Sequence, residues 1–389
     1  MALFFLRYLL IAGSVAAAIY AFILARSEQL FHLNTAESVP AAVKLVPYHS
    51  AYLTRLAAWQ PDERDSLLRR AVALNPWDFQ SWIQLGLITE LQQGNASEAE
   101  RNYLRAAEVN RMFMPKWTLA NFYFRRQRTS DFFTWANRAL QITPYASDPI
   151  FGQMWMVGRD PARIAAAIPD RARVLLQYAW YLSNNRQFSE IPPIVQRLIR
   201  RVGKGDPALW GRDDLLASIE DRLLGEDDAR DALAIWGHLA SGGWIQHTVP
   251  DPKHPLTNGD FRVPFYRHGF DWAPVDAAGT RTEQYGGAVH VSLSGDQPEH
   301  CVLLRQFVPL ARGGAYTLEW RAVTQINGLA WHVEKQSADL LATGARWQFQ
   351  APASEVAVLS LEYDRPPGRV RESGTVTLES VTLLPRDGR

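Results

Sequence analysis

The chain has a single cysteine and almost no net charge, and each of these features excludes some classes of protein. Cys301 is alone among 389 residues, so an intrachain disulfide and a cysteine-based zinc cluster are excluded. Its apolar surroundings, Cys301-Val-Leu-Leu, predict a small buried side chain. The formal net charge is +1, whereas a protein that holds nucleic acid needs a strongly basic surface, so we expect no nucleic-acid partner.

Motifs of the common catalytic mechanisms are also missing. The sequence contains no Gly-x-Ser-x-Gly, no phosphate-binding loop, no His-Glu-x-x-His and no glycine fingerprint after a strand. His247, His254 and His268 lie in one proline-rich region without the spacing of metal ligands, and they are predicted to be solvated or packed in turns. These absences favour a protein that is not an enzyme.

A long apolar run lies near the start of the chain. Residues 8–25, YLLIAGSVAAAIYAFILA, carry no charge, and about 20 residues at 1.5 Å each cross a bilayer core. We predict an uncleaved transmembrane anchor over residues 1–26. A cleaved signal peptide is the alternative, because a short basic start precedes an alanine-rich run. Arg7 before the run predicts a cytoplasmic N-terminus, with the bulk of the chain periplasmic or extracellular.

Between residues 40 and 241 the chain repeats itself. Ala71, Ala106 and Ala139 are 35 and 33 residues apart, and Trp82 and Trp117 are 35 residues apart. A period of about 34 residues is typical of helical hairpins that stack into a solenoid. We expect about five such hairpins, in a degenerate form.

This region resembles the tetratricopeptide repeat family. The matching residues are Trp82, Leu85 and Gly86 on a first helix, Ala99, Tyr103 and Ala106 on a second helix, and Pro76 and Pro144 as helix ends. Asn121 and Arg111 stand where the family has Gly and Pro. The resemblance implies a protein partner held in a groove lined by first helices, with candidates Gln80, Ile83, Leu87, Glu90, Thr118, Phe122 and Arg125. Ordinary surface and core packing is the alternative for these residues.

After a proline-rich linker, residues 242–256, the pattern changes from helical to alternating. Seven short runs rich in Val, Thr, Tyr, Trp and Leu are separated by Gly, Pro and Asp turns, which predicts an all-β sandwich over residues 257–386. In YTLEWRA, Tyr316, Leu318 and Trp320 alternate with polar residues, so one face of that strand is predicted to be buried and Trp320 to lie in the core.

The terminal region resembles the jelly-roll carbohydrate-binding modules. Asn258-Gly259-Asp260-Phe261, then RQFVPLARGGAYTLEWRA, then TLESVTLLP follow the order of motifs in that family. The resemblance implies a sugar ligand and a structural calcium ion, with oxygen ligands from Asn258, Asp260 and Glu379. Arg262 replaces a frequent Glu, and Glu379-Ser380-Val381 replaces Asp-Asp-Val. No other cofactor is expected.

Sugar binding requires exposed aromatic rings beside polar groups, because the apolar faces of sugars stack on rings while their hydroxyls need donors and acceptors. A sandwich core also needs large aromatics, so core packing is the alternative for every candidate. The direction of Trp272, in the segment NGDFRVPFYRHGFDW, separates the two readings most sharply. The glycan-binding candidates are Tyr266, Phe270, Trp272, Tyr285, Trp331, Trp347 and Tyr363.

These patterns predict a transmembrane helix, an all-α tetratricopeptide-like solenoid and a C-terminal all-β jelly roll. The predicted function is a non-catalytic membrane-anchored scaffold, whose solenoid binds protein and whose sandwich binds glycan or protein during assembly or export of envelope polysaccharide. One alternative is a purely structural scaffold of a membrane complex. Another is a jelly-roll glycan-active enzyme, which needs two carboxylates in one cleft and has Glu319, Glu334 and Glu362 as candidates.

Overall fold

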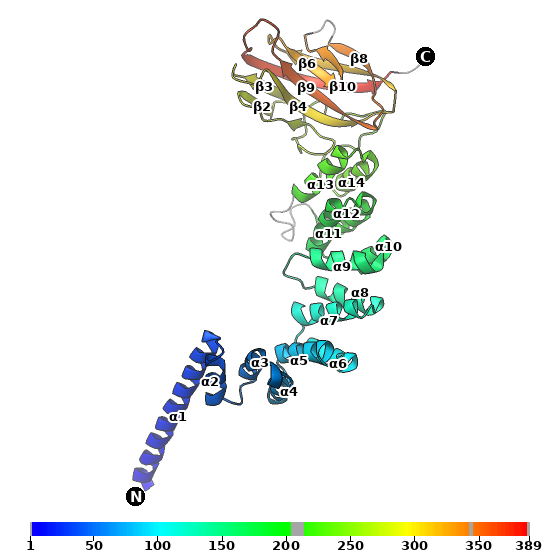
Figure 1. Ribbon diagram of the computed structural model, residues 1–389. Helices are drawn as coiled ribbons and strands as arrows, with labels where there is room; N and C mark the ends of the chain where they lie inside the picture. The colour runs from blue at the N-terminus through cyan, green and yellow to red at the C-terminus, as the bar shows by residue number, and fades with distance from the viewer. Residues whose placement is uncertain (1, 204–213, 342–344, 387–389) are drawn as a thin grey trace. The chain divides into compact units, whose positions relative to one another are not determined.

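The computed structural model of the chain describes residues 2–203, 214–341 and 345–386. It has the predicted fold class, with a long N-terminal helix, an array of helices and a C-terminal sandwich of two antiparallel sheets (Figure 1). The chain divides into two compact units, residues 1–167 and 168–389. The last helices therefore belong to the same unit as the sandwich, and each unit is described by itself.

Helices make up the described chain as far as residue 241. In the first unit they are α1 (Ala2–Leu33), α2 (Ser38–Leu45), α3 (Ser50–Trp59), η1 (Pro61–Glu63), α4 (Arg64–Leu74), α5 (Phe79–Leu91), α6 (Ala96–Val109), α7 (Phe113–Arg125), α8 (Thr129–Leu140), α9 (Asp148–Gly158) and α10 (Pro161–Ala167). In the second unit they are α11 (Ala172–Asn184), η2 (Phe188–Glu190), α12 (Ile191–Arg201), α13 (Asp214–Gly225) and α14 (Ala229–Ser241). From α3 to α14 the helices pack as consecutive pairs, which gives six hairpins in the described chain where about five were expected.

The repeated small residues lie where helices approach each other most closely. Ala71, Ala106 and Ala139 occupy corresponding places on α4, α6 and α8, and all three are fully buried. A Cβ on Gly86 would lie 2.5 Å from the ring of Tyr103, which is itself fully buried and cannot move aside. The repeat signal therefore comes from the geometry of helix packing within the first unit.

Helix α1 is long and apolar enough to cross a membrane. Its apolar span from Arg7 to Leu33 covers 27 residues, and an 18-residue window within it has a mean hydropathy of 2.2, with none of that window buried against the rest of the described chain. A signal sequence would meet the same criterion of length and composition.

The sandwich consists of two five-stranded antiparallel sheets. One has the order β1-β4-β9-β6-β7 and the other β2-β3-β10-β5-β8. The strands are β1 (Ala273–Pro274), β2 (Thr280–Tyr285), β3 (Ala288–Leu293), β4 (His300–Pro309), β5 (Ala315–Val323), β6 (Leu329–Val333), β7 (Gln336–Asp339), β8 (Arg346–Gln350), β9 (Val356–Asp364) and β10 (Gly374–Pro385).

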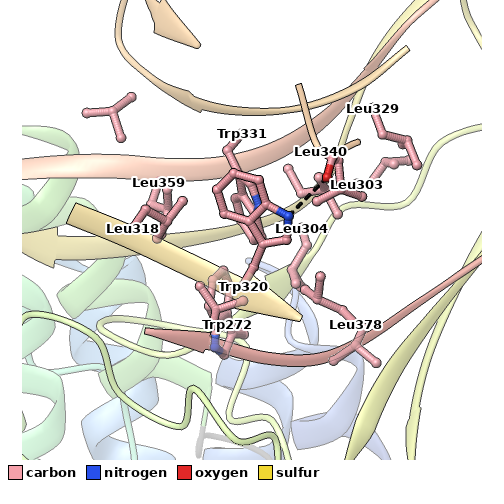
Figure 2. Packing of buried hydrophobic residues seen from close by; sticks show 14 of the residues in the cluster. Trp272, Leu303, Leu304, Leu318, Trp320, Leu329, Trp331, Leu340, Leu359 and Leu378 are labelled. Carbon is pink, nitrogen blue, oxygen red and sulfur yellow. Dashed lines mark hydrogen bonds between the residues drawn. The ribbon is translucent and has the colours of Figure 1, made fainter. Parts of the chain in front are cut away.

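Three tryptophans lie together in the core between the sheets. Trp272, Trp320 and Trp331 are surrounded by buried leucines of both sheets, and the indole N–H of Trp320 donates to the Leu340 carbonyl at 3.0 Å (Figure 2). The predicted burial of Trp320 is therefore confirmed. Cys301 belongs to the same cluster, as predicted, and burial raises the pKa of its thiol.

Candidate functional site

The outer face of the β2-β3-β10-β5-β8 sheet is a polar surface built from several strands. Along each strand alternate residues point into the core, as Val289 and Val291 do in β3, so the residues between them face outward. We call this surface the sheet face, and its outward side chains include Arg281, Glu283, Tyr285, His290, Ser292, Glu319, Arg321, Arg346, Gln348, Thr375 and Thr377.

Two hollows adjoin each other on the sheet face. One has a volume of about 550 Å³, and its polar lining comes from Asp260, Arg262, Tyr285, His290, Arg321, Thr377, Glu379 and Ser380. The other has a volume of about 630 Å³ and is lined chiefly by Glu319, Arg321, Arg346, Ser380 and Thr382. Arg321 and Ser380 line both hollows, so the two form one continuous depression across the sheet.

A stacked pair of rings borders the first hollow. Tyr285 is 59% exposed, and its ring lies on the imidazole of His290 with centroids 3.8 Å apart and an angle of 11° between planes. The Thr377 hydroxyl lies within hydrogen-bond distance of that imidazole, 3.1 Å from Nδ1. The pair is an exposed flat platform with hydroxyl groups beside it.

The charges around the two hollows are mostly paired. Arg262 lies 3.5 Å from Asp260, and Arg346 lies 3.2 Å from Glu319. Arg321 donates to the Ser380 hydroxyl at 3.1 Å, and in the described part of the chain no carboxylate lies within ion-pair distance of it. Arg321 is therefore the cation of the sheet face that is available to an acidic group of a ligand.

Four of the seven predicted glycan-binding aromatics are wrong as surface platforms, because the structure buries them completely. Trp272, Trp331 and Tyr363 fill the sandwich core, where the period of two along β6 and β9 turns the last two inward. Phe270 packs edge-on against Trp236 of α14, with ring centroids 5.9 Å apart. Trp272 thus faces inward, and its indole N–H donates to the Asn258 carbonyl at 3.2 Å.

The other three predicted aromatics lie in different places. Trp347 is partly buried against the core beside Phe349, and Tyr266 is partly buried with its ring edge-on to Trp236. Tyr285 alone of the seven lies on the sheet face. Sequence reasoning missed His290, Arg321 and Ser380, because a histidine, an arginine and a serine on three separate strands give no local signal of a shared surface.

The predicted calcium ligands differ in their surroundings. The amide of Asn258 donates to the Val263 carbonyl at 2.7 Å and accepts the Val263 N–H at 3.0 Å, so it bridges its own loop. Asp260 and Glu379 do line one hollow, but Asp260 has Arg262 beside it, and calcium needs six or more oxygens. No three His, Cys, Asp or Glu side chains of the described residues gather as a metal requires.

The carboxylates named for an enzyme do not share a cleft. Glu319 lies on the outer face of one sheet, paired with Arg346, whereas Glu362 lies on the outer face of the other sheet, 3.6 Å from His300. Glu334 lies in the turn between β6 and β7. A glycosidase of the predicted kind would have to use other groups, and Asp260 with Glu379 is the carboxylate pair that lines one hollow.

In the helical array the predicted groove residues differ in exposure and in pairing. Phe122 is wrong as a groove residue, because it is buried between the rings of Tyr103 and Tyr123. Glu90 and Arg125 come together across α5 and α7, with Nη2 and Oε2 2.7 Å apart, and they satisfy each other. Gln80 is exposed, and the half-buried residues are Ile83, Leu87 and Thr118.

A different hollow of the first unit has unpaired cations. It lies between α8 and α10, has a volume of about 590 Å³, and its polar lining is Ser130, Thr134, Asn137, Arg138, Gln141 and Arg163. The guanidinium of Arg138 lies 4.4 Å from the ring centroid of Trp135, and that of Arg163 lies 5.1 Å from Phe133. In the described residues neither arginine has an ion-pair partner. We call this the α8–α10 hollow.

The region predicted as a linker is packed rather than free. Trp244, Ile245 and His247 are buried. The ring of Trp236 in α14 is fully buried, and its centroid lies 5.8 Å from that of His247 and 5.9 Å from that of Tyr266. The Trp236 indole N–H donates to the Thr248 carbonyl at 2.9 Å. The last helical hairpin and the segment before β1 therefore share one small core, which we call the joint.

Two acids of α13 face the joint. Asp221 accepts the Gly269 N–H at 2.8 Å and pairs with His268 Nδ1 at 2.6 Å. Glu220 is completely buried, and neither of its oxygens has a hydrogen-bond partner in the described chain. Burial, and then the charge of Asp221, raise the pKa of Glu220 well above its ordinary range.

Gly269 is the residue that allows this approach. Its φ is +60°, and a Cβ there would lie 2.7 Å from the Glu220 carboxyl group and 2.8 Å from the Trp236 ring. Only glycine fits both the backbone angle and the space. Of the three predicted histidines, His254 is exposed, whereas His247 and His268 take part in the joint.

Comparison with known proteins finds likenesses in structure alone. No protein-family model matches the chain, and no curated protein matches it. Among solved structures, YrrB, described as a TPR protein with an unusual peptide-binding site, has 11% identity and a TM-score of 0.27, over 54% of this chain and 93% of its own. A CBM4 structure has 18% identity and a TM-score of 0.25, over 33% of this chain and 98% of its own.

Yeast Tom70 has 17% identity and a TM-score of 0.30, over 53% of this chain and 45% of its own. The first two structures, a TPR protein and a CBM4, are of the two kinds of module that the sequence resembles. At these identities and TM-scores the matches carry no argument about what the chain binds.

Proposed function

We propose that this chain is a non-catalytic, membrane-anchored binding protein whose sandwich holds a glycan on the sheet face. The observation that carries the proposal is the exposed Tyr285–His290 platform at the edge of two adjoining hollows that share Arg321. Sugar rings present apolar C–H faces that stack on such a platform, and their hydroxyls hydrogen-bond to side chains like Thr377 and Ser380. Arg321 favours a glycan that carries carboxylates.

The sheet-face proposal predicts a loss of binding without a loss of folding. Tyr285→Ala and Arg321→Ala are each expected to weaken binding of the full chain to an acidic polysaccharide by at least about tenfold, or 1.4 kcal/mol. Unfolding midpoints should change little, because both side chains are exposed. Affinity electrophoresis across acidic and neutral polysaccharides measures the first effect, and urea unfolding measures the second.

Matched controls exist for both variants. Arg281 lies on the same sheet but lines neither hollow, and Tyr48 is an exposed tyrosine of the helical unit, so Arg281→Ala and Tyr48→Ala should bind as the parent chain does. If the folded parent chain binds no polysaccharide of either kind, the glycan function is wrong. The purely structural scaffold would then be the better description, and release of reducing ends by the parent chain would favour the enzyme instead.

The proposed setting is the cell envelope, with α1 as the anchor and the rest of the chain periplasmic or extracellular. Support comes from the apolar span of α1 and from Arg7 on its N-terminal side. A glycan-binding sandwich held at a membrane by a helical array suits the assembly or export of envelope polysaccharide. Protease accessibility of the chain in intact cells would test which side the bulk of it occupies.

For the helical array we propose a protein partner with an acidic segment, bound in the α8–α10 hollow. The supporting observation is the pair of arginines, Arg138 and Arg163, that lie on aromatic rings without carboxylate partners in the described residues. Planar guanidinium groups bind carboxylates through paired hydrogen bonds. Asn137 and Gln141 lie beside them, where Asn137 donates to the Ala167 carbonyl at 2.8 Å and Gln141 donates to Asn137 at 2.9 Å.

The acidic-segment proposal predicts a salt-sensitive interaction. An Arg138→Ala, Arg163→Ala double variant is expected to reduce capture of Asp- and Glu-rich peptides by about tenfold or more at low salt, and the difference should shrink at high salt. Fluorescence polarisation with labelled acidic peptides and their amidated versions measures the effect. Arg101→Ala, on the exposed side of α6, is the control, and equal peptide binding by the double variant and this control would contradict the proposal.

A further inference from the structure

Three turns that join successive helical hairpins of the first unit each expose one large apolar side chain. Trp77 lies between α4 and α5, Met112 between α6 and α7, and Tyr145 between α8 and α9, and they are 71%, 70% and 60% exposed. They are 35 and 33 residues apart, which is the spacing of the buried alanines of the repeat. Corresponding positions of successive repeats lie along one edge of a solenoid, so the three side chains form a row.

Each turn holds its apolar residue in the same way, because a side-chain oxygen two residues earlier accepts the backbone N–H of the exposed residue. The three pairs are Asn75 with Trp77 at 3.1 Å, Asn110 with Met112 at 2.8 Å, and Thr143 with Tyr145 at 3.2 Å. Such a bond imitates a backbone turn and fixes the chain locally. The row is therefore presented from ordered backbone, which reduces the entropy lost when a partner binds.

An arginine precedes each exposed residue by seven positions and reaches back to the turn before it. Arg70 donates to the Pro47 carbonyl at 3.4 Å, in the turn between α2 and α3. The guanidinium carbon of Arg105 lies 5.8 Å from the centroid of the Trp77 ring. Arg138 is the third member of this series. Cations and apolar side chains therefore alternate along the row.

More positive charge gathers at the middle turn. Lys116 donates to the Arg111 carbonyl, and the pKa of Lys116 is lowered first by partial burial and then by the charges of Arg138 and Arg111. Within the described residues Arg70, Arg111 and Lys116 have no ion-pair partner. The positive charge of this edge is therefore largely uncompensated by the chain.

The acids near the three turns are already engaged. Asp78 accepts the Ser81 N–H and hydroxyl as the cap of α5, and Asp148 lies in the first turn of α9, where a negative charge stabilises the helix. Glu108 pairs with Arg105 at 3.0 Å in an exposed ion pair, which is a weak one. A carboxylate from a partner can therefore reach the arginines of the row.

We propose that this edge binds a protein segment that carries both apolar and acidic side chains. We call it the turn edge, and it consists of the three turns with the cations beside them. Trp, Tyr, Met and Arg are the side chains that protein interfaces favour, and Trp and Arg are frequent among those that contribute most to binding. A sugar is a poorer fit, because Met112 at the middle of the row offers no flat ring.

The turn edge is separate from the sites proposed above. It lies in the first unit, whereas the sheet face belongs to the second unit, and it shares only Arg138 with the α8–α10 hollow. The inference requires neither of those sites. Variants of the turn edge that leave Arg138 in place can therefore test it independently.

The test uses the full chain in detergent micelles and a displayed library of short random peptides. The library is first cleared on a Trp77→Ser, Met112→Ser double variant, which removes peptides that bind elsewhere, and is then selected on the parent chain. The selected peptides are expected to be rich in Asp and Glu and in Leu, Ile or Phe. Both replaced side chains are exposed, so the double variant should unfold at the same urea concentration as the parent chain.

Single substitutions then test the two kinds of contact. Fluorescence polarisation with one selected peptide is expected to show binding weaker by at least about tenfold for Trp77→Ala and for Arg105→Ala. High salt should narrow the difference for Arg105→Ala and not for Trp77→Ala, because only the charged contact is screened. Leu91→Ala is the matched control and should bind as the parent chain does, since Leu91 is 68% exposed at the opposite end of α5 from Trp77.

Several results would overturn the inference. The turn edge is not a protein-binding surface if no peptide is enriched on the parent chain, or if the enriched peptides lack acidic residues. Arg163→Ala changes the α8–α10 hollow alone, so a loss of peptide binding in this variant, with binding kept in Arg105→Ala, would assign the peptide to that hollow. If no peptide is enriched and Trp77→Ala weakens binding of an acidic polysaccharide, the edge holds glycan instead.

Discussion

A Trp272→Ala variant is expected to lose about 3–5 kcal/mol of unfolding free energy, because it removes a fully buried indole from the centre of the sandwich core. The ring centroid of Trp272 lies 5.8 Å from that of Phe261 and 6.1 Å from that of Trp331. Its indole N–H donates a hydrogen bond to the Asn258 carbonyl. No neighbouring side chain can fill the cavity that is left, since the surrounding core is already packed (Figure 2). Urea unfolding followed by tryptophan fluorescence measures the loss.

The same experiment distinguishes a core tryptophan from a ligand platform. Tyr285→Ala removes a 59% exposed ring, and its unfolding free energy should stay within about 0.5 kcal/mol of the parent value. A platform residue would show the reverse pattern, with stability kept and sugar binding lost. If Trp272→Ala unfolds at the parent urea concentration and loses polysaccharide binding, its assignment to the core is wrong.

Replacing Glu220 with glutamine is expected to stabilise the protein at neutral and alkaline pH. The buried carboxyl group is protonated more readily in the folded state, where burial and Asp221 raise its pKa, than in the unfolded chain, where the pKa is near 4.5. Each pKa unit of that difference corresponds to about 1.4 kcal/mol. Because 1 kcal/mol moves the unfolding midpoint by about 2–4 °C in a unit of this size, the effect is readily measured.

The direction of the pH dependence follows from proton linkage. The folded state binds the Glu220 proton more tightly than the unfolded chain does. The stability gained from this protonation is complete below the pKa of Glu220 in the unfolded chain, and it is lost as the pH rises toward the pKa of Glu220 in the folded state. Glutamine cannot ionise, so Glu220→Gln should match the parent chain at acid pH and exceed it increasingly from about pH 5 upward. Thermal unfolding of the two chains between acid and alkaline pH gives the difference at each pH.

A control for this measurement lies in the same unit. Glu334 is an exposed carboxylate in the turn between β6 and β7, so Glu334→Gln should follow the parent chain at every pH. The opposite result for Glu220→Gln, a variant less stable than the parent at alkaline pH, would mean that the carboxylate is ionised and paired in the folded protein. Our description of the joint would then be wrong.

The repeat period, the alternation of the strands and the apolar start of the chain were enough to predict the three parts of this protein. Each of these signals is local, because helix and strand periods bring residues to one face within a single element. The burial of Ala71, Ala106 and Ala139 and the inward direction of Trp320 followed from that alone. The direction of Trp272 did not, because residues 258–272 form a loop without a regular period.

The candidate sites depend on contacts between elements, which local patterns do not report. The sheet face assembles when β2, β3, β10 and β5 align side by side, and a register shift between Leu378 and Ser380 places Ser380 opposite Arg321. The joint forms because Gly269 lets the chain approach Glu220 and Trp236. Gly269 also donates its N–H to Asp221, which lies 48 residues before it in the sequence. The sequence by itself determined which elements form and which face of each is apolar. Only the tertiary structure decided which polar side chains meet, because strand order, register and close packing are set by the whole fold.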